Sequence, residues 1–157
     1  MLKNTFIAAT LSVLPFGMVQ PAFAETAVFA GGCFWCVESD MDHVKGVTST
    51  VSGYAGGTME NPTYENHEGY TEAVKLEFDP AVVSYETLVA TFLRTIDVTD
   101  AGGQFCDRGS SYVSAIFPMD AKQKEAAEKA VVEAEKVLGQ KIVTPVVSFT
   151  TFGNAED

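Results

Sequence analysis

The chain has 157 residues, of which 46% are hydrophobic and 20% are charged. This length and composition allow one compact core, and no change in composition along the chain marks a second domain. The formal net charge of −11 argues against nucleic acid and anionic membranes as partners, because both repel an acidic surface.

Residues 1–24 have the pattern of a secretory signal peptide. Lys3 precedes an apolar run over residues 6–16, and the small-residue motif Ala22-Phe23-Ala24 follows it. The run is shorter than the roughly 20 apolar residues of a membrane-spanning helix. We therefore expect cleavage after Ala24, export to the bacterial periplasm and no membrane insertion after cleavage. The mature domain, residues 25–157, has nine Lys and Arg against 21 Asp and Glu and so a net charge of −12, and we expect a monomer.

Strands and helices alternate in the first half of the mature chain. A buried strand is predicted over residues 27–32, a helix over 33–43 and a strand rich in Val and Thr over 47–54. A long loop with Gly56-Gly57 and Asn61-Pro62 comes next. Residues 72–78 then alternate between apolar and polar side chains, which is typical of a half-buried strand.

Ser84 opens the second half as a predicted helix cap, because apolar residues recur at helical spacing up to Ile96. Gly102, Gly103 and Gly109 indicate a second long loop over residues 97–111, before a strand over 112–117.

A long amphipathic helix is predicted over residues 121–138. Asp120 and Gln123 resemble a capping box at its start, and Gly139 closes it. The last predicted strand spans 142–149, with Pro145 indicating a sheet edge.

This order of elements, β-α-β-β-α-β followed by α-β, predicts an α+β fold. We expect a two-layer sandwich of the split-βαβ, ferredoxin-like type, with helices on one face of a mainly antiparallel sheet. The two long loops are the expected place of the active site, because long loops in a compact domain are usually functional or disordered.

Cys33 is the first candidate for chemistry. It follows a predicted strand and begins a predicted helix, where free N–H groups and the helix dipole favour an anion, so it should be the more nucleophilic thiol. Cys36, one turn later, is expected to be better buried and less ionised. The chain has three cysteines, an odd number that fits poorly with a purely structural disulfide framework.

Several other interpretations of the cysteines remain open at this point. They can be small buried hydrophobic residues, as free cysteines often are. A zinc site would need two further ligands, and His43 and His67 have no finger-like spacing, so we expect no metal and no cofactor. The C-x-x-C spacing is also typical of thioredoxin-like disulfide oxidoreductases, and a metal or heme chaperone is a third alternative.

Glu72 is a candidate proton donor. Its parity in the predicted strand matches that of Val74, Leu76 and Phe78, so its carboxyl group should face the core. Burial disfavours the charged form of a carboxyl group and so favours a proton donor near neutral pH. The alternative is that Glu72 lies at a strand end, in water.

Four aromatic residues lie near these positions. Phe34 and Trp35 directly follow Cys33 and can line a small apolar pocket for a methyl group, although ordinary core aromatics would have the same pattern. Tyr64 and Tyr112 border the two long loops and are candidate hydroxyl donors, although most isolated tyrosines are structural.

The same residues stand in motifs that resemble the A-type methionine sulfoxide reductases, from about Val28 to Asp157. The matching stretches include Gly32-Cys33-Phe34-Trp35, Gly53-Tyr54-Ala55-Gly56-Gly57, Asn61-Pro62-Thr63-Tyr64, Glu72-Ala73-Val74, Asp107-Arg108-Gly109-Ser110-Ser111-Tyr112 and Ala155-Glu156-Asp157. The resemblance implies the following roles: Cys33 as nucleophile, Phe34 and Trp35 as methyl pocket, Glu72 as acid, Tyr64 and Tyr112 as donors to the sulfoxide oxygen, and Asp107 as an organiser of the site.

The resemblance also implies the reaction. Such an enzyme reduces the S epimer of methionine sulfoxide, free or in oxidised proteins, through a Cys33 sulfenic acid. A second thiol then forms an intramolecular disulfide, which a thioredoxin-like protein reduces. Cys36 and Cys106 are equal candidates for that second thiol.

Several positions depart from the family pattern. The family usually has Gly at Cys36, Asn at Cys106 and Arg at Val113, and its loop before Glu72 is longer, with a histidine near Tyr70. Family members also continue beyond the position of Asp157, often with a resolving cysteine, so we expect the chain to be truncated at its C-terminus.

Overall fold

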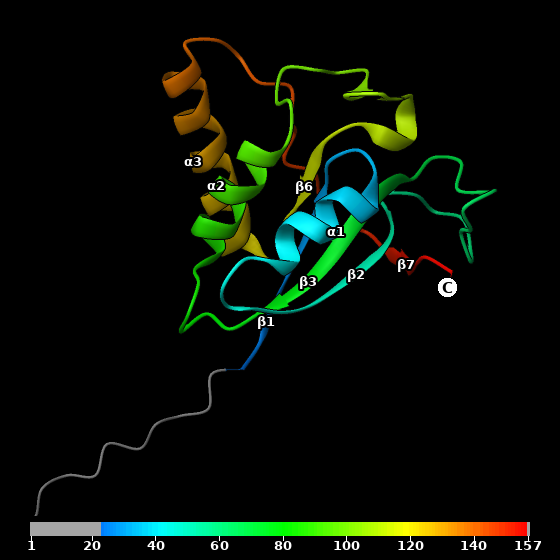
Figure 1. Cartoon of the computed structure of the whole chain (residues 1–157), viewed down its shortest axis with the longest axis horizontal. Coiled ribbons are helices and arrows are strands. Elements are labelled where there is room, and N and C mark those ends of the chain that lie inside the picture. Colours follow the sequence, from blue (N-terminus) through cyan, green and yellow to red (C-terminus); the bar gives the residue numbers. More distant parts are fainter. Residues whose placement is uncertain (1–22, 157) are drawn as a thin grey trace, which may run out of the picture.

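The computed structural model describes residues 23–156 (Figure 1). Most of the predicted signal peptide, residues 1–22, lies outside this part. The described residues form three α-helices, α1 (Phe34–Asp42), α2 (Tyr85–Thr95) and α3 (Ala121–Leu138), and a short 3-10 helix, η1 (Ser110–Tyr112). Their strands are β1 (Glu25–Ala30), β2 (Val47–Ala55), β3 (Thr71–Phe78), β4 (Gly103–Gln104), β5 (Asp107–Arg108), β6 (Ala115–Phe117) and β7 (Phe152–Asn154).

The predicted helix caps of α2 and α3 form. The Ser84 side chain accepts the N–H of Thr87, and the Asp120 side chain accepts the N–H of Gln123. Gly139 ends α3 with φ +69, a left-handed conformation that costs glycine little. The capping box differs in one respect, because Gln123 Oε1 accepts the N–H of Met119 instead of Asp120.

The main sheet has five strands in the order β6-β1-β3-β2-β7, and each neighbouring pair is antiparallel. β3 lies between β1 and β2, the two strands that α1 connects. β1 lies between β3, which precedes α2 and the second long loop, and β6, which follows them. These connections agree with the predicted α+β class and its mainly antiparallel sheet.

The predicted strand over 142–149 does not form. In its place a single bridge joins Val146 to Ile116: the Ile116 N–H donates to Pro145 O, and the Val147 N–H donates to Ile116 O. Pro145 has no N–H with which to extend the ladder. The fifth strand is instead β7, which pairs with β2.

The predicted strand over 112–117 is also shorter than expected. Its ordered part is β6, and Tyr112 belongs to η1. The second loop contains a small hairpin of β4 and β5 that is separate from the main sheet. The end of η1 and two residues without regular structure, 113 and 114, therefore replace the first half of that strand.

Both faces of the sheet are covered. Alternate strand residues such as Phe29 and Val74 share one core with the three helices, which therefore cover one face. Their neighbours, among them Val28 and Ala73, form a second cluster on the opposite face, and Phe149 and Phe152 of the C-terminal segment pack on it. Figure 1 shows α2 beside α3, with α1 crossing in front of the sheet.

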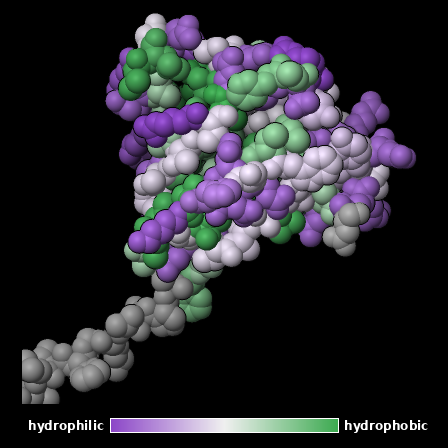
Figure 2. Space-filling model, in the orientation of Figure 1, coloured by the Kyte–Doolittle hydropathy of each residue, from purple (hydrophilic) through white to green (hydrophobic). Residues whose placement is uncertain are grey.

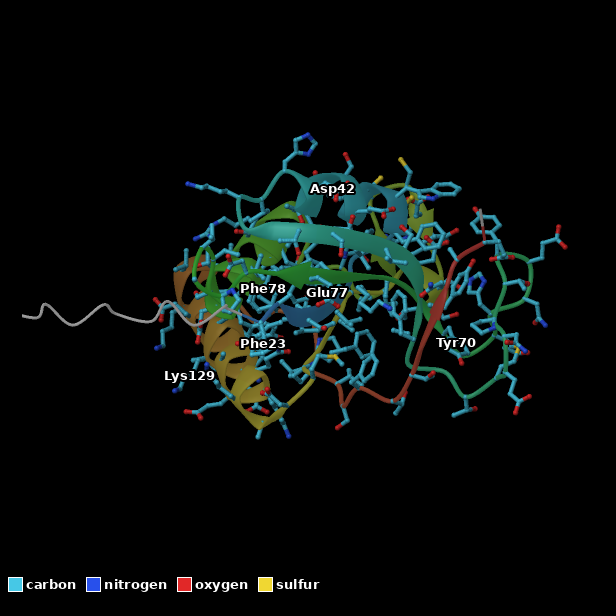
Figure 3. All side chains as sticks on the ribbon, turned by 90° about the horizontal axis from the view of Figure 1, so that it is seen from below. Phe23, Asp42, Tyr70, Glu77, Phe78 and Lys129 are labelled. Carbon is cyan, nitrogen blue, oxygen red and sulfur yellow. The ribbon has the colours of Figure 1, made fainter. Side chains whose placement is uncertain are left out.

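The loops that carry the candidate residues lie at one end of β3. Figure 3 shows Phe78 at one end of this strand and Tyr70, in the first long loop, beyond the other. Glu72 lies at the Tyr70 end. On the face drawn in Figure 2, hydrophilic residues alternate with smaller hydrophobic patches. Within residues 23–156, none of the helices has the length and apolar character needed to cross a membrane.

Candidate active site

Cys33 lies at the junction of β1 and α1, as predicted. Its backbone carbonyl accepts the N–H groups of Cys36 (3.1 Å) and Val37 (3.2 Å), which starts the helix. The Cys33 side chain makes no capping hydrogen bond, and the residue is partly exposed. The thiol is therefore both held at a helix start and accessible.

Gly32 allows the second long loop to pack against this junction. It has φ +85, and a Cβ atom there would stand 2.6 Å from Gln104 Cβ. Gln104 is buried, and its side-chain amide accepts the N–H of Asp97 and donates to the Asp97 carbonyl. A glycine at position 32 is thus required by both the backbone conformation and the close approach.

Glu72 faces the core, as its parity predicts, and its side chain is only 1% exposed. Its Oε2 accepts the backbone N–H of Phe34 at 3.0 Å. Burial raises the pKa of Glu72, and the hydrogen bond from Phe34 opposes the shift without cancelling it. The structure therefore holds a protonatable carboxyl group against the backbone of the residue that follows Cys33.

The two aromatic residues after Cys33 have different environments. Phe34 is buried, whereas Trp35 is 60% exposed. The Tyr64 ring stacks on Trp35 with 6.0 Å between centroids and 16° between planes, and it lies 6.3 Å from the Phe34 ring. The three rings form an apolar wall beside the thiol that is open to solvent on the Trp35 side.

The two predicted tyrosine donors come together from different loops. Tyr64 precedes β3 and Tyr112 ends η1, and their hydroxyl groups lie close enough to interact. Burial raises the pKa of Tyr112, and the nearby Glu72 carboxyl group adds to the shift. The Tyr112 hydroxyl group therefore keeps its proton and can donate it in a hydrogen bond at the Glu72 side of the site.

A hollow of about 120 Å³ lies on the other side of the thiol. Cys33, Cys36, Gln104, Phe105 and Asp107 are among its lining residues. Asp107, the predicted organiser, thus reaches the site from β5. Its negative charge contributes to the raised pKa of both Glu72 and Cys36.

The prediction that Cys36 is better buried than Cys33 is wrong. Cys36 is exposed, because the first turn of α1 turns its side chain toward solvent at the rim of the hollow. Desolvation and a hydrogen bond with the Cys33 thiol raise the pKa of Cys36. Cys106 is exposed as well, and all three thiols are unpaired.

Comparison with known proteins identifies the family of the chain. The family model described as peptide methionine sulfoxide reductase matches residues 25–157. The chain belongs to this reductase family. Peptide methionine sulfoxide reductase MsrA 2 of Rhizobium meliloti is 48% identical over 154 residues, which cover 97% of this chain and 76% of the relative. Membership of the reductase family makes the chain an oxidoreductase that reduces methionine sulfoxide.

Solved reductase structures have the same fold. Methionine sulfoxide reductase A of Corynebacterium diphtheriae is 28% identical, with a TM-score of 0.76 over 88% of this chain and 73% of that protein. Mxr1 of Saccharomyces cerevisiae in its reduced form has a TM-score of 0.80 at 24% identity, over 88% and 83% of the two chains. The same yeast protein has been solved in complex with Trx2, with a TM-score of 0.63 at 21% identity over 87% and 84% of the chains.

Two further residues that contact the candidate site were not singled out from the sequence. Tyr54 is fully buried, and its hydroxyl group donates to Glu156 Oε2 at 3.1 Å. The Glu156 carboxylate also accepts the backbone N–H of Tyr64 at 3.0 Å. Both residues fall in stretches that match the reductase family, and that match was the available signal.

His67 is the third residue that sequence reasoning passed over. Its ring stacks on that of Tyr54 with 4.9 Å between centroids and 19° between planes. In residues 23–156 no group of three or more His, Cys, Asp or Glu side chains has the arrangement of a metal site.

Proposed function

We propose that the chain reduces the S epimer of methionine sulfoxide, free or in proteins, with Cys33 as the nucleophile. The observation that carries the proposal is the hydrogen bond from the Phe34 N–H to the Glu72 carboxyl group. It joins the residue next to the thiol to a buried acid. A reactive thiol and a proton donor so close together suit the reduction of a sulfoxide, in which sulfur is attacked while oxygen is protonated.

In the first step, the Cys33 thiolate attacks the sulfoxide sulfur and Glu72 gives a proton to the oxygen. The Tyr64 and Tyr112 hydroxyl groups donate hydrogen bonds to the same oxygen as it gains charge. The protonated oxygen then passes from the methionine sulfur to the Cys33 sulfur as the bond between the two sulfurs breaks. The methionine sulfur thereby gains two electrons, and the Cys33 sulfur loses two and becomes a sulfenic acid. Glu72 suits this role because burial raises its pKa and keeps its acid form populated.

We assign the sulfoxide methyl group to the apolar wall of Phe34, Trp35 and Tyr64. The stacked rings of Trp35 and Tyr64 leave an open apolar side that a methionine side chain can enter from solvent. Because Trp35 is exposed, the same entry accepts a residue within a polypeptide as well as a free amino acid.

We assign the second, resolving thiol to Cys36. Its sulfur attacks the Cys33 sulfenic acid, water leaves and a disulfide forms. Three observations support this choice over Cys106: the contact between the Cys33 and Cys36 thiols, their shared hollow, and the position of Cys106 outside the residues that line it.

The reductant we propose is a thioredoxin-like protein dithiol. It would attack the disulfide through the exposed Cys36 sulfur and regenerate both thiols. The complex of the yeast protein with Trx2 supports this class of partner. We also propose that residues 1–24 are removed on export and that the enzyme acts in the periplasm, in keeping with a family match that begins at Glu25.

One assay tests the proposed function directly. The protein is mixed with each epimer of methionine sulfoxide and dithiothreitol, and methionine is measured beside a Cys33→Ser control. We expect methionine from the S epimer only, and none from the control. Methionine production by Cys33→Ser would remove the proposed nucleophile, and disulfide exchange without sulfoxide reduction would favour a disulfide oxidoreductase.

A further inference from the structure

His67 lies in the first long loop, three residues after Tyr64, and both of its ring nitrogens have partners. Nδ1 lies 3.0 Å from the Thr63 carbonyl oxygen, and Nε2 lies 2.9 Å from Ser111 Oγ. A carbonyl oxygen can only accept, so Nδ1 carries the proton and the neutral ring accepts the Ser111 hydroxyl at Nε2. One side chain therefore holds two separate segments.

Those two segments are the ones that carry the proposed tyrosine donors. Thr63 directly precedes Tyr64, and Ser111 directly precedes Tyr112. The hydrogen bond between His67 and Ser111 joins residues 56–70 to residues 97–112, beside the direct approach of the Tyr64 and Tyr112 hydroxyl groups. The separation of the two tyrosines thus depends in part on a side chain that belongs to neither.

The imidazole ring itself is held in place. Its face lies against the Tyr54 ring at 4.9 Å, and the buried Tyr54 hydroxyl donates to Glu156. The Glu156 carboxylate in turn accepts the N–H of Tyr64. A ring fixed by stacking and by two hydrogen bonds can set the position of its partners more narrowly than a flexible side chain can.

We propose that His67 is a positioning residue of the reaction, which sets the separation of the Tyr64 and Tyr112 hydroxyl groups by joining their two loops. The proposal rests on the proposed function, because the two hydroxyl groups matter only if both bind the sulfoxide oxygen. A displacement of about 1 Å in such a pair can cost on the order of 100-fold in rate.

The link does not depend on one protonation state of His67. The charged groups that face the ring are Glu72 from β3 and Glu156 from the C-terminal segment, and the rings of Tyr54 and Tyr64 lie against it. If the ring gains a proton, Nε2 becomes a donor and the Ser111 hydroxyl becomes the acceptor. The donor and the acceptor exchange roles, and the hydrogen bond still joins His67 to Ser111.

The test uses variants that cut this link on either side. His67→Phe keeps the stacking on Tyr54 and loses both hydrogen bonds, and Ser111→Ala loses only the bond to Nε2. Ser110→Ala is the matched control, since Ser110 belongs to the same turn and has no hydrogen bond to His67. The measurement is kcat/KM for the S epimer with dithiothreitol, together with a thermal melt of each variant.

We expect kcat/KM to fall roughly 10-fold or more in His67→Phe and severalfold in Ser111→Ala, mainly in kcat, with Ser110→Ala unchanged. If His67 has only a structural role, His67→Phe should lower kcat/KM by the same factor whether or not Tyr112 is also replaced. A role that acts through the tyrosines predicts that His67→Phe has less than about a twofold effect once Tyr112→Phe is present, because residues that act as a unit are not additive.

Full activity of a folded His67→Phe protein would overturn the inference, and so would an equal loss in the Tyr112→Phe background. If His67→Phe fails to fold, Ser111→Ala and its combination with Tyr112→Phe decide the question in the same way. Failure of the proposed function is distinct, because it would appear as an unmodified protein that does not reduce the S epimer or as an active Cys33→Ser variant.

Discussion

The Phe34 backbone N–H donates a 3.0 Å hydrogen bond to Glu72 Oε2 and so connects the start of α1 to the buried end of β3. The contact joins residues 38 positions apart in the chain. It ties the side chain of the proposed acid to the backbone of the residue that follows the proposed nucleophile, Cys33, and does not involve the Cys33 side chain. It also gives the buried carboxyl group a hydrogen-bond partner, which such a group needs in the core.

Replacement of Glu72 by Gln should remove most of the activity and leave the fold intact. The amide keeps an acceptor for the Phe34 N–H and loses the proton, so we expect kcat to fall by roughly 10²- to 10⁴-fold, the usual contribution of a general acid. Because the pKa of Glu72 is raised, the unmodified enzyme should lose kcat/KM only as pH rises above the range of ordinary carboxyl groups. Rates of the unmodified enzyme and of Glu72→Gln measured from pH 5 to 9 check the loss of kcat and its pH dependence. If the variant loses kcat/KM at high pH in the same way as the unmodified enzyme, a group other than Glu72 causes that loss.

The same substitution should make the protein more stable at neutral pH. The folded state holds its Glu72 proton more tightly than the unfolded chain, whose carboxyl group titrates near the ordinary value of 4.5. As pH rises above that value, the unfolded state ionises first and the free energy of unfolding falls.

Glu72→Gln has no proton to lose at this position, so its advantage should be absent below about pH 4 and should grow with pH. The gain is about 1.4 kcal/mol for each tenfold difference in proton affinity between the folded and unfolded states. Urea unfolding at pH 4, 6 and 8 measures it. An advantage that is constant across this range would contradict a raised pKa.

The disulfide formed after one equivalent of sulfoxide should join Cys33 to Cys36. In the absence of reductant, peptide mass spectrometry should find these two residues linked and Cys106 free. Cys36→Ser should still turn over with dithiothreitol, which can reduce the sulfenic acid directly, and should lose turnover with thioredoxin. Cys106→Ser is the matched control and should keep both activities; a Cys33–Cys106 peptide would reverse the assignment.

Replacement of Phe105 by Gly should stabilise the protein. Phe105 has φ +50 at the tip of the β4–β5 hairpin, and its side chain is 71% exposed. A left-handed conformation costs a residue with a side chain roughly 1–2 kcal/mol, and glycine recovers this apart from its larger unfolded-state entropy. We expect the free energy of unfolding to rise by about 0.5–1 kcal/mol.

Urea unfolding checks this stability gain: the midpoint should rise while the dependence of the unfolding free energy on urea concentration stays the same. Asn61→Gly provides a comparison, since Asn61 has nearly the same φ, +52, and asparagine adopts the left-handed conformation more easily. Its unfolding free energy should change by less than about 0.5 kcal/mol. A lower stability of Phe105→Gly would mean that the exposed ring makes a contact worth more than the backbone cost.

Local sequence patterns predicted the elements that depend on local interactions. Ser84, Asp120 and Gly139 mark helix ends because their side chains or backbone satisfy groups of the same turn. The parity of Glu72 also held, since side chains in a strand alternate between its two faces whatever the strand pairs with.

Patterns that depend on distant pairing were predicted less well. The segment 142–149 has the composition of a strand, yet the place next to β2 is taken by β7. The exposure of Cys36 and the shortening of the strand at Tyr112 depend likewise on how loops pack across the helix start. The composition of a segment does not show which edge of a sheet the segment will pair with.

The sequence by itself determined the position of Cys33 at a strand-to-helix junction, the inward-facing carboxyl group of Glu72 and the membership of the reductase family. Only the tertiary structure decided that Phe34 donates to Glu72, that Glu156 holds Tyr64, and that His67 joins the two tyrosine loops. The physical reason is the distance along the sequence over which each interaction acts. Capping and alternation act within one turn or one strand, whereas these three bonds join residues 38, 92 and 44 positions apart and form only when the packed core brings them together.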